Sequence, residues 1–158
     1  MIRPFLIAAA SAVVVLSSSA TFAQQAGGTA AEAKAMLVKA VAAVKDNKTK
    51  ALELFNNGEG GFLDRDLYVF CNKLSDGEFV AMGNPNAKAI IGKDVRTLKD
   101  SAGNNFGQDI FTGEQKPEGQ ITEVSYLYPK PGADKTPVPK ISLVTKAGDL
   151  GCGVGYYK

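Results

Sequence analysis

The sequence contains no histidine among its 158 residues. Without an imidazole it cannot build a Ser-His-Asp or Cys-His catalytic arrangement, a histidine zinc site or the usual proton shuttle near neutral pH. Carboxylate, lysine and tyrosine chemistry remain available, but no paired carboxylates or metal-spaced cysteines stand in a recognised frame. We therefore expect a protein that is not an enzyme and that uses no metal or cofactor.

Cysteine is also scarce, with Cys71 and Cys152 the two in the chain. In an oxidising compartment, an even number of cysteines far apart in sequence favours a disulfide, so we expect these two to be paired. The alternative is two buried free thiols in neighbouring strands, which pack as small hydrophobic side chains.

An excess of charge of one sign is missing as well. The formal net charge is +2, the lysines are scattered along the chain, and no motif combines basic and aromatic residues. Nucleic-acid binding is therefore not expected.

The N-terminus has the three parts of a secretory signal peptide. Arg3 precedes the apolar run 5–16, and the small-residue site Thr21-Phe22-Ala23 follows. The run is shorter than the roughly 20 apolar residues that a membrane span needs. We predict a signal peptide over residues 1–23 and one periplasmic domain over residues 24–158, with no membrane insertion after cleavage near Ala23.

Helical spacing dominates the first part of this domain. Thr29-Ala30-Ala31-Glu32 has the spacing of a capping box, and apolar residues then recur every three or four positions. The pattern weakens at Asp46-Asn47, resumes in a second segment and ends at Asn56-Asn57-Gly58. The apolar positions are Ala33, Leu37, Ala40, Val41, Val44, Ala51, Leu52 and Phe55. Packing of this face against a sheet is the expected role.

Strand patterns follow the helical segment. A Gly- and Asn-rich insertion, 83–119, separates the first two strands from the last three, and it includes a brief helix near Phe106 and Ile110. We predict an α+β fold in which the helix covers one sheet face and the insertion covers the other. The predicted strands are Asp66–Asn72, Glu78–Met82, Gln120–Tyr128, Val138–Thr145 and Leu150–Tyr157.

Strand alternation suggests where a ligand could bind. Tyr126 and Tyr128 share one face of their strand, and Lys140 and Ser142 share one face of the next. Two hydroxyls and an ammonium could recognise a small anion such as a carboxylate. The alternative is half-buried sheet tyrosines beside a solvated edge lysine.

The last strand alternates Gly151, Gly153 and Gly155 with larger residues. A row of positions without side chains permits close approach of another element, and helix packing is favoured there over ligand contact.

Taken in order, several segments resemble a single Cache domain, the extracytoplasmic ligand-sensing module of many bacterial receptors. The resemblance covers nearly all of residues 24–158. Its segments are the helical lead Glu32–Phe55, the strand Asp66–Phe70, Asn84-Pro85, Ile91–Val95, Leu98–Asp100 with Gly103, Pro139–Ser142 and Gly151–Tyr157.

The resemblance implies a PAS-like five-stranded antiparallel sheet with its first and last strands adjacent at the centre, which also supports a Cys71–Cys152 disulfide. It further implies a small-molecule pocket on the face away from the N-terminal helix. Ligands of the family are often small carboxylates or amino acids. We expect this pocket to be lined by Tyr68, Met82, Tyr126, Tyr128, Lys140 and Ser142.

Two departures from the family pattern bear on function. Relatives often carry His-Pro where this chain has Asn84-Pro85, so a histidine contact to ligand cannot operate. Receptors continue into a transmembrane helix and signalling domains, whereas this sequence ends at Lys158. We therefore expect a small-molecule sensor that acts with a separate membrane receptor or kinase. The alternative is a periplasmic interaction protein with a vestigial pocket.

Overall fold

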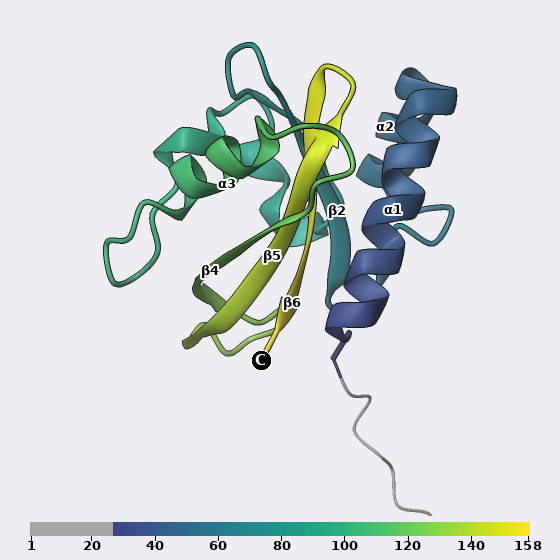
Figure 1. The fold of residues 1–158 in the computed structure, drawn as a ribbon. Helices are drawn as coiled ribbons and strands as arrows, with labels where there is room; N and C mark the ends of the chain where they lie inside the picture. The colour runs from purple at the N-terminus through teal and green to yellow at the C-terminus, as the bar shows by residue number, and fades with distance from the viewer. Residues whose placement is uncertain (1–26) are drawn as a thin grey trace, which may run out of the picture.

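An antiparallel sheet lies between two layers of helix (Figure 1). The computed structural model describes residues 27–158, so the predicted signal peptide lies outside the described residues. Along the sheet the order is β1-β2-β6-β5-β4, and β3 also pairs with β2. The strands are β1 (Leu63–Asp64), β2 (Leu67–Lys73), β3 (Phe79–Met82), β4 (Thr122–Pro129), β5 (Pro137–Ala147) and β6 (Leu150–Tyr157).

This arrangement confirms the predicted α+β class and the adjacency of the first long strand to the last, here β2 and β6. The sheet has six strands rather than five because the two-residue β1 pairs with the start of β2. No helix within residues 27–158 has the length and apolar character needed to cross a membrane.

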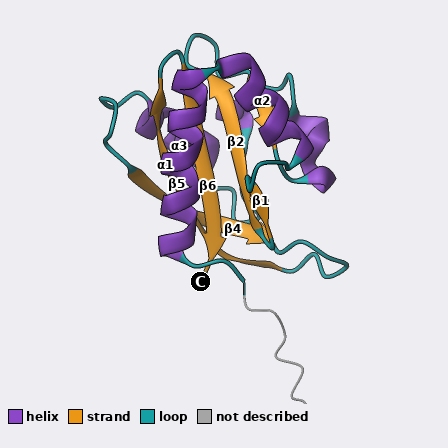
Figure 2. Ribbon diagram, turned by 90° about the vertical axis from the view of Figure 1, so that its right-hand side faces the viewer, coloured by secondary structure: helices purple, strands orange, loops and turns teal. Residues whose placement is uncertain are grey.

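Helices α1 (Ala30–Asp46) and α2 (Lys48–Asn57) cover one face of the sheet. The predicted capping box is present, because Glu32 N–H donates to Thr29 Oγ1 and the Glu32 carboxylate accepts from Thr29 N–H. The helix is interrupted at Asn47, whose side chain accepts a hydrogen bond from Lys50 N–H and so caps the start of α2. At its other end α2 is capped by Gly58, which has a left-handed φ of +69°. Figure 2 shows α1 lying along β5 and β6.

The opposite face is covered by the insertion, which contains the 3₁₀ turns η1 (Pro85–Ile90) and η2 (Val95–Thr97) and helix α3 (Phe106–Glu114). Two glycines let α3 approach its neighbours closely. A Cβ on Gly107 would overlap the backbone of Val95, and one on Gly113 would press on Val144 and Thr122.

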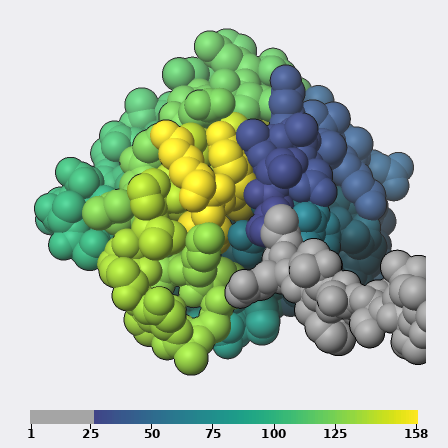
Figure 3. All heavy atoms as spheres, turned by 90° about the horizontal axis from the view of Figure 1, so that it is seen from below, coloured from purple at the N-terminus to yellow at the C-terminus, as the bar shows by residue number. Residues whose placement is uncertain are grey.

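Because both faces are covered, β2 and β6 are buried along most of their length, and their residues divide between two cores. Val69 and Cys71 point toward α1, whereas Tyr68, Phe70 and Asn72 point toward α3. Cys71 lies directly opposite Cys152 in the β2–β6 register and forms the predicted disulfide with it, inside the α1-side core. Seen from below, the start of α1 lies next to the end of β6 (Figure 3).

Candidate functional site

The glycines of β6 form a trough along the α3 side of the sheet. Each glycine position is covered by a side chain from a neighbouring element: Glu114 of α3 over Gly151, Phe70 of β2 over Gly153, and Lys140 of β5 over Gly155. A Cβ at any of the three would collide with the covering side chain. The expected close helix packing thus takes place at Gly151, while the other two glycines accommodate strand side chains.

Lys140 is the central residue of the candidate site. Its side chain crosses β6 at Gly155 and is only 1% exposed. The ammonium donates hydrogen bonds to the hydroxyls of Tyr68 at 3.0 Å and Tyr157 at 3.5 Å. The alternative of a solvated edge lysine is therefore wrong, because the trough lets the side chain lie flat against the sheet.

Three aromatic rings surround this ammonium. Lys140 Nζ lies 4.6 Å from the ring centroid of Tyr68, 4.7 Å from that of Tyr157 and 5.1 Å from that of Tyr128. Cation–π attraction of this kind offsets part of the cost of burying the charge. We call Tyr68, Tyr126, Tyr128, Lys140, Ser142 and Tyr157 the Lys140 cluster.

No acid neutralises the buried ammonium: within residues 27–158, Lys140 forms no ion pair. Burial lowers the pKa of Lys140 from 10.5 to about 7, and the charge of Asp66 offsets this shift only in part. An anion bound beside Lys140 would raise this pKa again and favour the protonated ammonium.

The tyrosine hydroxyls of the cluster are neutral donors. Burial raises the pKa of Tyr68 to about 12 and that of Tyr126 well above 10.0. Tyr126 and Ser142 share a buried hydrogen bond of 2.8 Å. Neutral hydroxyls beside an ammonium are suited to hold a carboxylate.

Five of the six predicted ligand residues, all except Met82, are thus brought into one cluster. Met82 is not one of these polar side chains, but it is buried in the same apolar core as Tyr68 and Tyr126. Two further residues were missed. Tyr157 continues the every-second-residue series of the β6 glycines, so it faces the same side of the sheet, and strand alternation was sufficient to identify it. Asn84, in a loop, partly offsets the rise in the pKa of Tyr68, and no periodicity indicates this residue.

The cluster is closed in this structure. Phe106 of α3 stacks on Tyr126 with ring centroids 4.0 Å apart, and the Tyr157 hydroxyl donates to the carbonyl of Pro129 at 2.7 Å. A ligand reaches Lys140 only if some of these side chains move.

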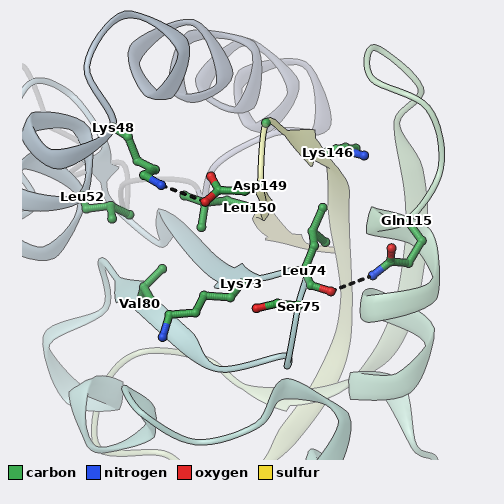
Figure 4. Close-up of a pocket in the computed structure, with 11 residues that line it drawn as sticks. Lys48, Leu52, Lys73, Leu74, Ser75, Val80, Gln115, Lys146, Asp149 and Leu150 are labelled. Carbon is green, nitrogen blue, oxygen red and sulfur yellow. Dashed lines mark hydrogen bonds and ion pairs between the residues drawn. The ribbon is translucent and has the colours of Figure 1, made fainter.

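An open cleft of about 580 Å³ lies elsewhere, at the end of the sheet formed by α2, the β2–β3 turn and the β5–β6 turn (Figure 4). None of the predicted site residues lines it. Its Lys48 and Lys73 remain about half exposed and are paired with Asp149 and Glu78. Solvated, paired lysines gain little from an anionic ligand, so the desolvated Lys140 cluster is the stronger candidate.

Comparison with known proteins defines the class. Residues 8–157 match the family described as single Cache domain 2, and the chain belongs to that family. Cache domains are extracytoplasmic sensory modules rather than enzymes. No curated protein matches the chain.

Solved structures agree with this class. A methyl-accepting chemotaxis protein from Vibrio parahaemolyticus is similar with a TM-score of 0.63 and 23% identity, covering 80% of this chain and 86% of its own. The periplasmic sensor domain of a chemotaxis protein gives 0.56 and 26%, covering 78% and 86%. A Cache chemosensory domain described in terms of carboxylic acid recognition gives 0.53 and 22%, covering 78% and 84%.

Proposed function

We propose that this chain is an exported sensor domain that binds a small carboxylate at the Lys140 cluster and communicates its presence to a separate membrane receptor or kinase. The observation that carries the proposal is the buried Lys140 ammonium, which lacks an acidic partner among residues 27–158. A buried unpaired charge is costly, and a bound carboxylate would supply the missing counter-charge.

The size and polarity of the cluster support a small ligand. Tyrosine hydroxyls surround one ammonium, so one carboxylate group with a short apolar remainder suits the site. The structural neighbour described as recognising carboxylic acids motivates the same ligand class.

A thermal-shift screen tests the ligand class. The mature protein is mixed with acetate, propionate, pyruvate and lactate, and with acetamide and propionamide as neutral controls of similar shape. At 100 times Kd a ligand adds about 2.7 kcal/mol, which raises Tm by roughly 10 °C for a domain of this size. Stabilisation by a carboxylate but not by its amide supports the proposal. Equal behaviour of acid and amide contradicts it.

Matched variants locate the binding site. Lys140→Met removes the ammonium while keeping an apolar side chain that extends to the Cε position, and Lys140→Ala also removes its bulk. Lys146→Met changes a lysine of the same strand that lines the open cleft. We expect ligand stabilisation to be lost in both Lys140 variants and kept in Lys146→Met. Loss of ligand stabilisation in Lys146→Met, with both Lys140 variants still responding, would show that the ligand binds in the cleft.

The closed state of the cluster favours a second function. With Phe106 stacked on Tyr126 and Lys140 buried, the α3 face also fits a periplasmic interaction protein whose pocket is vestigial. That function predicts a partner whose binding is insensitive to metabolites. A carboxylate that stabilises the protein through Lys140 would exclude it.

Export is part of the proposal. Cleavage near Ala23 leaves a mature chain that starts at Gln24. Intact mass spectrometry of the protein recovered from the periplasmic fraction tests this directly. A chain retained in the cytoplasm with its N-terminus intact would contradict export.

A further inference from the structure

Helix α3 ends on a buried carboxyl group that the Lys140 cluster does not use. Glu114 is the last residue of α3 and is fully buried, with its side chain lying over Gly151 of β6. Its Oε2 accepts a hydrogen bond from Nδ2 of Asn72 on β2 at 2.9 Å, and Asn72 is also fully buried. The two side chains join the helix to the centre of the sheet.

Each partner has one buried oxygen without a hydrogen bond. Among the described residues, Glu114 Oε1 and Asn72 Oδ1 both lack a donor. Both atoms are acceptors when the carboxyl is ionised, so an ionised Glu114 would leave each unsatisfied. A protonated carboxyl has one hydroxyl donor, which is the group that this pair is missing.

We propose that Glu114 is a neutral carboxylic acid in the folded protein, and that its Oε1–H donates to Asn72 Oδ1. With the bond from Asn72 Nδ2 to Glu114 Oε2, this makes a reciprocal acid–amide pair. Glu114 is then a positioning residue for α3, the helix that closes the Lys140 cluster.

The surrounding charges support the neutral form. Asp109 and Lys116 on or next to α3 are exposed, Arg96 of η2 is paired with Asp94, and Lys73 of β2 is paired with Glu78. Lys146 of β5 lines the open cleft. Within residues 27–158 none of these cations forms an ion pair with Glu114.

Electrostatics agree with the hydrogen-bond geometry. Burial raises the pKa of Glu114 from 4.5 to about 8, against the opposing effect of the Asn72 amide. Protonation of Glu114 therefore supplies the donor that the two oxygen atoms lack.

The pair matters for the candidate site because α3 is attached at both ends. At its start, Phe106 stacks on Tyr126, a member of the Lys140 cluster. At its end, Glu114 bonds to Asn72. Loss of the Glu114 proton would place two acceptors opposite each other and weaken the docking of α3, so alkaline pH would loosen the cover of the cluster.

The pH dependence of unfolding tests the proton. Glu114→Gln keeps the shape and supplies an N–H donor that does not titrate, and Glu123→Gln, at an exposed position of β4, is the control. Because the pKa of Glu114 is raised in the folded protein, the folded wild type holds a proton between pH 4.5 and 8 that the unfolded chain has lost. Its folding equilibrium constant relative to Glu114→Gln should fall about tenfold per pH unit across that window and level off above it. A ratio that is constant with pH would overturn the proposal.

Infrared spectroscopy observes the acid directly and needs no variant to fold. In protein labelled with ¹³C-glutamate, a carbonyl band of a neutral carboxylic acid should be present near neutral pH and disappear as the pH passes about 8. Its absence at pH 6.5 would show an ionised Glu114. Neither measurement uses a ligand, so the outcome is independent of carboxylate binding at Lys140.

Discussion

Lys140 on β5 reaches across β6 to donate a hydrogen bond of 3.0 Å to the hydroxyl of Tyr68 on β2. The path exists because Gly155 lies beneath the lysine side chain. Three strands therefore cooperate to hold one ammonium away from water. The charge state of this group therefore determines whether an anion can bind beside it.

The first prediction concerns the ligand-free protein. The folded pKa of Lys140 is lowered to about 7, so between pH 7 and 10.5 the unfolded chain binds a proton that the folded chain does not. Stability therefore rises with pH across this window, and below pH 7 the burial cost is fully present. Relative to Lys140→Met, the wild type should gain on the order of 4 kcal/mol from pH 7 to 10.5. Urea unfolding at pH 6, 8 and 10 measures the difference.

Lys146→Met is the matched control for this series, since it changes a lysine that lines the open cleft. Its stability relative to wild type should show no comparable rise. If the difference between wild type and Lys140→Met stays constant from pH 6 to 10, Lys140 does not titrate as its burial requires.

The second prediction concerns ligand affinity. A carboxylate needs the Lys140 ammonium, but the ligand-free group loses its proton above pH about 7. Binding above this pH therefore takes up a proton, and Kd should rise by up to tenfold per pH unit. Titration calorimetry in two buffers of different ionisation enthalpy measures the proton uptake. Affinity that is flat from pH 6.5 to 9 would mean that the ligand does not contact Lys140.

The sequence predicted the local features of the fold. The capping box at Thr29, the break at Asn47 and the left-handed Gly58 are each determined by residues within a few positions, and the structure confirms them. Alternation also placed Lys140 and Ser142 on one face of their strand, and in the structure both side chains lie over Gly155. Such patterns hold because they depend on the backbone period and on side chains close in sequence.

Burial of specific polar residues could not be predicted in this way. Lys140 is buried because a glycine of β6 and rings from three different strands meet around it. Glu114 is buried because Asn72, 42 positions earlier, lies under the end of α3. Both depend on contacts between distant segments, and neither residue type indicates burial by itself.

The third prediction tests the glycine trough. Gly153→Ala would drive a Cβ into the ring of Phe70, so the ring or the strand must shift. Overpacking of this kind costs about 1–3 kcal/mol. Phe70→Leu removes the colliding ring, and the double variant should therefore be less destabilised than the sum of the two single variants. Chemical denaturation of all four proteins gives the coupling energy, and strict additivity would contradict the contact.

The fourth prediction concerns the Cys71–Cys152 disulfide, which joins β2 to β6 across a sequence separation of 81. Closing so long a loop restricts the unfolded chain, so Cys71→Ala/Cys152→Ala should lower the free energy of unfolding by about 2–5 kcal/mol.

The disulfide lies in the α1-side core, whereas the Lys140 cluster lies on the α3 side. The double variant should therefore retain the ligand response of the wild type at a temperature where it is folded. Urea unfolding with and without reductant measures the first effect and a thermal-shift titration the second. If the double variant is as stable as the wild type, or if reductant leaves the stability of the wild type unchanged, the disulfide does not restrict the unfolded chain.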